Sequence, residues 1–194
     1  MEYCSGNGQW ILEKAKNNPE INWIAVEKRF DRARRIWVKR HNMGISNLLV
    51  VFGDARLLTK YYLPKNSISE VFINFPDPWP KKKHAKNRLV TPGFMEMLSG
   101  VVKQQGVVTM VTDDALAKDC MVDAAFFSKS WKHEFPEPYY LTEMPGYGGS
   151  YFDALWREKN REIKYLQFKN LRMDNKNRGR GIRTPDLLVP NQPR

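Results

Sequence analysis

The sequence predicts a doubly wound α/β fold with a mostly parallel sheet and helices on both faces. Short apolar runs bounded by turn residues alternate along the chain with longer segments of helical periodicity. A glycine turn near the start leads into the first helical segment, and acidic residues follow several of the strands. A length of 194 residues suits one domain, and 42% hydrophobic residues with six tryptophans exclude a disordered chain.

The first element is a strand that runs at once into a glycine turn at Gly6 and Gly8, after which residues 9–17 have a helical pattern. We expect this strand to be truncated, because only residues 1–4 precede the turn. Such a turn lets the backbone approach a ligand and directs helix-terminal N–H groups at it. Glycines also serve ordinary turns, so this signal alone is weak.

Residues 21–27 predict a buried parallel strand that ends in Glu27. Glu27 follows Gly8 by 19 residues, close to the spacing at which an acid hydrogen-bonds a ribose hydroxyl. The alternative is that Glu27 only begins the next helix, near its positive dipole end.

The next helix spans residues 28–42, and we expect Phe30 and Trp37 to lie in the core. Seven cations face one acid, Asp31, in its first thirteen residues. These cations form either a solvated face or a contact surface for phosphates. They are Lys28, Arg29, Arg32, Arg34, Arg35, Lys39 and Arg40.

A third strand over residues 47–52 leads to Asp54, which either caps the following helix or joins the other acids at the carboxyl edge. In an open α/β sheet that edge is where ligands bind. We expect four carboxylates there, suited to a ligand rich in hydroxyl, amino and cationic groups: Glu2, Glu27, Asp54 and Asp77.

Asp77 follows a strand over residues 69–75 and stands among Pro76, Pro78 and Pro80. The prolines exclude a helix and predict a stiff extended turn that holds the carboxylate in place. A dense basic run comes directly after this turn.

The rest of the chain continues the alternation. Thr91 and Pro92 predict the N-cap and first position of a helix that ends near residue 100. The later elements are a strand at 106–112, a helix ending near 127, an edge strand at 131–135, a helix at 150–160 and a strand at 163–168. We expect residues 171–194 to form a disordered basic tail.

The net charge of +11 favours a polyanionic partner, either nucleic acid or an anionic membrane surface. No apolar run approaches the ~18 residues of a spanning helix, so we expect no membrane segment. Cys4 and Cys120 stand in no metal-binding spacing, which favours buried thiols in a reduced cytoplasmic protein without metal or disulfides. We expect a monomer or a weak homodimer.

The segment from Phe75 to Arg88 resembles the signature of the bacterial tRNA (guanine-N7-)-methyltransferases. The glycine turn, the strand end at Glu27 and the Gly53-Asp54-Ala55 turn are similar to other motifs of that family, and the resemblance spans residues 1–170. Cys4 departs from the pattern by replacing the first glycine of the turn.

The resemblance implies a Rossmann-like methyltransferase domain over residues 1–170 that methylates N7 of a guanine in the variable loop of tRNA. It implies S-adenosylmethionine as cofactor, bound at Glu2, Gly6, Gly8, Glu27, Asp54 and Asp77, with Asp77 also catalytic. It implies substrate contacts at Lys81, Asp113, Ser150 and Asp153, where Ser150 and Asp153 replace Thr and Glu. The basic run adds expected RNA phosphate contacts at Lys82, Lys83, His84, Lys86 and Arg88.

Two other classes remain open from the residues. An NAD-dependent oxidoreductase shares the glycine turn and the ribose acid, although residue 11 is Ile and the full G-x-G-x-x-G is absent. A truncated RNA-binding remnant without catalysis is the other.

Overall fold

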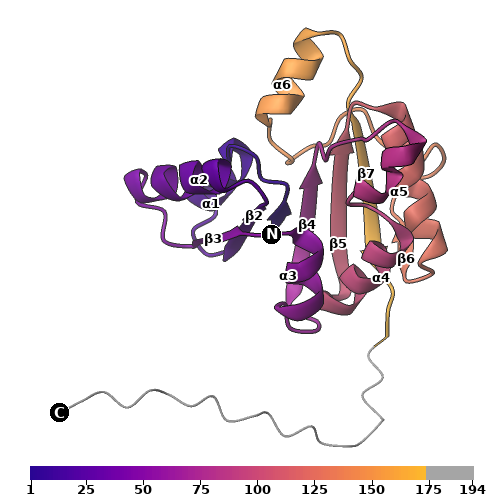
Figure 1. Cartoon of the computed structure of the whole chain (residues 1–194), viewed down its shortest axis with the longest axis horizontal. Coiled ribbons are helices and arrows are strands. Elements are labelled where there is room, and N and C mark those ends of the chain that lie inside the picture. Colours follow the sequence, from indigo (N-terminus) through magenta and orange to yellow (C-terminus); the bar gives the residue numbers. More distant parts are fainter. Residues whose placement is uncertain (174–194) are drawn as a thin grey trace, which may run out of the picture.

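The computed structural model describes residues 1–173, except for the side chain of Lys82. In this part of the chain, seven strands form one open sheet in the order β3-β2-β1-β4-β5-β7-β6 (Figure 1). The strands are β1 (Glu2–Tyr3), β2 (Trp23–Glu27), β3 (Leu48–Phe52), β4 (Ile68–Asn74), β5 (Val102–Thr112), β6 (Trp131–His133) and β7 (Lys164–Asn170). The helices are α1 (Gln9–Asn17), α2 (Phe30–Asn42), α3 (Ala55–Tyr61), the 3-10 helix η1 (Lys82–Asn87), α4 (Pro92–Val101), α5 (Ala115–Phe127) and α6 (Tyr151–Glu158).

The doubly wound topology is confirmed. The first five strands run parallel, whereas β7 is antiparallel to both β5 and β6. One core cluster packs α1 and α2 against one face of the sheet, and a second packs α4 and α5 against the other. From β1 the chain adds β2 and β3 on one side, and β4 and β5 then follow on the other side of β1. The boundary between β1 and β4 is the topological switch point, where such sheets bind ligands.

The short first strand lies at the centre of this sheet. Glu2 pairs with Ala25 of β2 and with Phe72 of β4, and the glycine turn follows directly at the carboxyl edge. The turn therefore lies beside the switch point.

Two predicted features of the elements are confirmed, several boundaries differ by one or two residues, and the largest difference is at the start of β5. The Thr91 side chain accepts a hydrogen bond from the Phe94 amide, and Pro92 occupies the first turn of α4. Strand β5 begins at Val102, four residues before its predicted start, because the pairing with β4 continues past a register shift between Ile68 and Glu70. Most of the predicted tail, residues 174–194, lies outside the described residues.

The prediction that Phe30 and Trp37 are core residues is wrong. They are 64% and 55% exposed, and the side of α2 that faces the sheet carries Ala33 and Ile36 instead. Phe30 and Trp37 stand seven residues apart and share one side of the helix, but that side lies on its outer flank.

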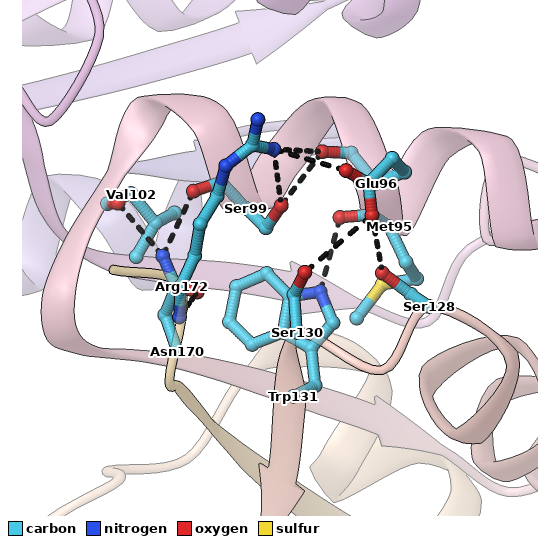
Figure 2. A network of polar contacts seen from close by, with 9 residues as sticks. All are labelled: Met95, Glu96, Ser99, Val102, Ser128, Ser130, Trp131, Asn170 and Arg172. Atoms are coloured by element: carbon cyan, nitrogen blue, oxygen red, sulfur yellow. Dashed lines mark hydrogen bonds and ion pairs between the residues drawn. The ribbon is translucent and has the colours of Figure 1, made fainter. Parts of the chain in front are cut away.

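A polar network ties the end of β7 to α4 at the edge of the sheet opposite the glycine turn (Figure 2). The fully buried Asn170 amide donates to the carbonyl oxygens of Ser99 and Val102, each at 2.9 Å, and to that of Lys103. Nearby, the Trp131 indole donates to the Met95 carbonyl. The Ser99, Val102 and Lys103 carbonyls belong to the end of α4 and the start of β5, where backbone acceptors need partners.

We expect Asn170→Ala to lower the free energy of unfolding by about 3 kcal/mol, because the substitution leaves buried carbonyls without a donor. Urea unfolding followed by circular dichroism measures this change. The matched control is Arg172→Ala, which removes a half-exposed ion pair to Glu96 and should change stability by less than ~1 kcal/mol. Equal losses in both variants would contradict the role given to Asn170.

Candidate active site

A cavity of about 540 Å³ opens at the carboxyl ends of the central strands. Its wall includes the glycine turn at Gly6 together with three of the predicted carboxylates, Glu27, Asp54 and Asp77. Glu27 ends β2, and the other three residues follow β1, β3 and β4, so they lie far apart in sequence. The fold thus brings together a close-approaching backbone turn and three acids.

The glycine turn has left-handed backbone conformation at both Gly6 and Gly8, with φ of 55° and 73°. A Cβ on Gly8 would lie 2.6 Å from Cγ1 of Ile36 in α2, so only glycine fits there. The Gly6 amide donates to Glu27 Oε2 at 2.8 Å. The turn is therefore fixed against α2 on one side and against the end of β2 on the other.

Cys4 occupies the position where the resemblance led us to expect glycine, and its φ of 59° is left-handed. Burial, with smaller contributions from the neighbouring carboxylates of Glu27 and Asp77, raises the pKa of its thiol to about 12. The thiol therefore lines the cavity in its protonated form.

We expect Cys4 to resist alkylation by iodoacetamide at pH 8, because with a pKa near 12 only about one thiol in ten thousand is ionised. Peptide mass spectrometry after a timed reaction measures this. The same reaction in guanidinium chloride should modify Cys4 fully and serves as the control. Rapid modification of the folded protein would show that the thiol is not shielded.

Glu27 is buried, and backbone N–H groups bind both of its carboxylate oxygens. Oε2 accepts from Gly6, and Oε1 accepts from Arg29 at 2.8 Å. Each oxygen of an ionised carboxylate has a further lone pair, so Glu27 can still accept hydrogen bonds from a ligand's hydroxyls. Glu27 thus orders the start of α2 through the Arg29 amide, and it also faces the cavity.

Asp54 likewise combines two roles. Its Oδ1 accepts from the amides of Arg56 and Leu57 and so caps α3, as the structural alternative predicted. The residue also lines the cavity, with Oδ2 3.9 Å from the Lys28 ammonium.

Asp77 is exposed and lines the cavity shared with the glycine turn. No hydrogen bond or ion pair joins its carboxylate to another of the residues in the 1–173 range. Burial of Pro76 and a 2.8 Å hydrogen bond from the Phe75 amide to Val111 fix the start of its segment. The backbone before Asp77 is therefore fixed, whereas its carboxylate has no partner among the described residues and is available to a ligand.

The backbone around Asp77 differs in part from the predicted extended turn. No helix forms, as expected, but Phe75 and Trp79 have left-handed φ values of 47° and 42°. Left-handed residues cost about 1–3 kcal/mol each and require support from their surroundings. Arg88 supplies it, because its guanidinium donates to the carbonyl oxygens of Pro78 and Trp79.

Glu2 does not share the cavity edge with the other three acids, which corrects that expectation. It pairs with Ala25, two residues before Glu27, and therefore lies deeper in the sheet beside a smaller adjoining pocket of about 40 Å³. Its Oε1 accepts from Asn74 Nδ2 at 2.7 Å, whereas its buried Oε2 has no hydrogen-bond partner within the described chain. Burial raises the Glu2 pKa to about 7, against the opposing effect of the Asn74 hydrogen bond.

The four residues expected to bind substrate are not among those that line the main cavity. Ser150 caps α6 and lines the pocket beside Glu2. Asp153 is buried against Arg157 and Tyr165, and Asp113 pairs with Arg161. Lys81 is exposed at the start of η1. In this structure the two acids therefore have intramolecular cationic partners.

The basic run forms η1, a 3-10 helix that the sequence patterns did not predict. Lys83 is exposed, Lys86 is exposed at the cavity wall, and the His84 ring lies 5.7 Å from that of Trp79. Arg88 is engaged with the proline turn and with Cys120 Sγ, so its geometry favours support of the turn over contact with RNA. The side chain of Lys82 lies outside the described part.

The cavity-lining residues that were not singled out as site residues include Arg32, Arg56 and Phe152. The sequence analysis named Arg32 only as one of the seven cations of residues 28–40. Arg56 stands two residues after the predicted helix cap Asp54, in no motif. Phe152 packs on Phe75 with ring centroids 5.9 Å apart, from inside the segment that contains Ser150 and Asp153. The position of Phe152 between two expected substrate contacts was the sequence signal that could have identified it as a site residue.

A membrane-spanning helix and a metal-binding cluster are both absent from the described residues. No helix there is both long and apolar enough to cross a bilayer. No group of three or more His, Cys, Asp or Glu side chains there is arranged to hold a metal ion.

Residues 1–145 match a family model described as "Putative methyltransferase". The chain is 43% identical over 167 residues to a protein named tRNA (guanine-N(7)-)-methyltransferase from Chlamydia felis (strain Fe/C-56), which covers 86% of this chain and 73% of that protein. A protein of the same name from Staphylococcus epidermidis is 36% identical over 114 residues, covering 59% of this chain and 53% of that protein.

Solved structures share the fold. The aminoglycoside resistance methyltransferase NpmB1 superposes with a TM-score of 0.60 at 16% identity, over 87% of this chain and 85% of that one. An S-adenosylmethionine dependent methyltransferase from Mesorhizobium loti gives 0.57 at 9% identity, over 87% and 89%. Fold, glycine turn and acidic cavity at the switch point define a methyltransferase of the Rossmann-like type. The chain belongs to the tRNA (guanine-N7-)-methyltransferase family.

Proposed function

We propose that the chain transfers a methyl group from S-adenosylmethionine to N7 of a guanine in the variable loop of tRNA. One observation carries the proposal: the unpaired Asp77 carboxylate shares a cavity with a glycine turn and two further acids. Membership of a family whose curated relatives are named for this reaction supports it.

The cavity and the pocket beside it have groups that complement the ribose and the ammonium group of S-adenosylmethionine. Glu27 has lone pairs left for ribose hydroxyls, and the tight turn at Gly6 allows close approach of the ligand. The buried Oε2 of Glu2 lacks a hydrogen-bond partner among the described residues, and a ligand ammonium group would satisfy it and favour the ionised carboxylate.

The bound cofactor would supply an electrophilic methyl group on a sulfonium ion. Guanine N7 has a free lone pair, so the N7–methyl bond forms as the sulfur–methyl bond breaks, and no proton has to leave first. The protein therefore needs no general base and contributes alignment and a suitable field. Because positive charge would pass from the sulfonium to the purine, the Asp77 carboxylate, which lines the cavity, would stabilise that charge before and after the transfer.

The basic run would hold the tRNA near this cavity. Lys83 and Lys86 are exposed for phosphate contacts, and Lys86 reaches the cavity wall. If the target guanine is stacked inside the tRNA, it must swing out, and the Phe75 and Phe152 rings at the wall offer a surface on which it can stack.

The direct test is incubation of the protein with unmodified tRNA and methyl-labelled S-adenosylmethionine, followed by mapping of the labelled nucleoside. We expect label on one guanosine in the variable loop. Transcripts in which 7-deazaguanosine replaces guanosine lack N7 and should accept no label, which makes them the control. Binding of tRNA without any transfer would favour the non-catalytic alternative, and binding of NAD in place of S-adenosylmethionine would favour the oxidoreductase.

A further inference from the structure

Helix α2 has an outward-facing row of rings that the packing of the domain does not use. We call Phe30, Trp37 and His41 of α2, with Phe52 of the edge strand β3, the α2 aromatic face. Phe30, Trp37 and Phe52 are 64%, 55% and 58% exposed. Trp37 and His41 stack with an interplanar angle of 9° and centroids 6.1 Å apart, and Phe30 meets Phe52 edge-on at 5.5 Å.

The helical part of the α2 aromatic face lies in or next to a strongly cationic segment of the chain. Residues 28–40 have seven cations and one acid. Arg29 is bound to Asp31 and Lys28 lies near Asp54, but no ion pair joins Arg34 or Arg35 to a carboxylate among residues 1–173. Clustered exposed rings on a soluble protein mark an interaction surface, and unpaired guanidinium groups beside them indicate an anionic partner.

We propose that the α2 aromatic face binds unpaired nucleotides of the RNA substrate outside the target guanine. Aromatic rings bind bases by stacking without regard to sequence, and flanking arginines bind the phosphates. This inference rests on the proposed function for the identity of the RNA.

The chemistry of this face favours RNA over a second copy of the chain. A two-fold interface would bring α2 against α2, so that Arg34 and Arg35 would face the same cations of the partner. Like charges placed face to face oppose association. A polyanion with flat bases complements both the charge and the rings.

The position of α2 connects this face to the cavity. Arg29 and Arg32, in the first turn of the helix, line the cavity wall. Trp37 follows Arg29 by eight residues, which is about 12 Å along a helix axis. Figure 1 shows α2 beside β3 at one end of the sheet, away from α4 and α5. The Trp37 side chain points about 140° around the helix axis from that of Arg32, so RNA with a guanine in the cavity would reach the α2 aromatic face by crossing the start of α2.

The test is Trp37→Ala, measured by fluorescence anisotropy with labelled tRNA and by methyl-transfer kinetics. We expect the tRNA Kd and KM to rise about tenfold, with kcat and the KM for S-adenosylmethionine unchanged. Trp37→Phe keeps a ring and should recover most of the affinity. Arg34→Ala should lower the slope of log Kd against log salt by about one.

The matched control is Phe127→Ala, which removes a 76% exposed ring from α5, on the other face of the sheet. It should leave tRNA affinity unchanged. If Trp37→Ala also leaves it unchanged while the wild-type chain methylates tRNA, the inference is overturned and the proposed function stands. If the wild type transfers no methyl group but Trp37→Ala still weakens tRNA binding, the face is supported and the proposed function fails. Loss of a dimer in light scattering on Trp37→Ala, with tRNA affinity unchanged, would assign the face to self-association and overturn the proposal.

Discussion

Asp77→Asn is expected to lower kcat for methyl transfer at least about a hundredfold, the usual effect of removing a positioned charge from a reacting centre. The carboxylate faces the cavity beside the glycine turn, and no other described residue competes for it. The variant keeps the shape of the side chain and removes only the charge that accompanies the moving positive charge. Single-turnover transfer with labelled S-adenosylmethionine at saturating tRNA measures the effect.

Stability and tRNA affinity should stay close to wild type in this variant. Because Asp77 is exposed and its side chain makes no hydrogen bond within residues 1–173, the free energy of unfolding of the variant should differ from wild type by less than ~0.5 kcal/mol. Asp123→Asn on α5 also neutralises an exposed carboxylate and provides the control for net charge. A parallel loss of activity, tRNA binding and stability would make Asp77 a structural residue and remove the basis for its catalytic role.

The strand ends were the part of this site that the sequence could predict. In parallel strands the residue that follows each apolar run lies at the carboxyl edge, so Glu27, Asp54 and the turn around Asp77 were placed correctly by local pattern alone. Glu2 was misplaced because strand register decides depth in the sheet. The pairing of Glu2 with Ala25 is a contact between segments that local sequence does not encode.

Contacts between residues far apart in sequence likewise decide which charged side chains remain available to bind a ligand. Asp153 and Asp113 have partners in Arg157 and Arg161, and Arg88 supports the carbonyls of the proline turn. The sequence of a motif does not show whether a basic or acidic residue in it has an intramolecular partner. Whether it is free depends on neighbours that the fold supplies, and the same holds for the outward side of α2.

Gly8→Ala is expected to lower the free energy of unfolding by about 3 kcal/mol and to weaken S-adenosylmethionine binding with it. A left-handed φ of 73° costs an alanine about 1–2 kcal/mol. The new Cβ would also lie 2.6 Å from Cγ1 of the fully buried Ile36, and overpacking of that kind costs about 1–3 kcal/mol more. Urea unfolding and titration calorimetry with the cofactor measure the two losses.

Gly6→Ala separates these two causes, because Gly6 is also left-handed but a Cβ there would meet only the Cys4 carbonyl oxygen, at 3.9 Å. It should cost only about 1–2 kcal/mol, from the backbone alone. In a double-mutant cycle, Gly8→Ala combined with Ile36→Ala should be less destabilising than the sum of the single changes by about 1–2 kcal/mol, since the 2.6 Å contact with Cγ1 is removed and only the Ile36 Cβ contact at 3.2 Å remains. Strict additivity would mean that α2 yields to the new methyl group, and the close packing of α2 on the glycine turn would then not be what fixes the shape of the cavity.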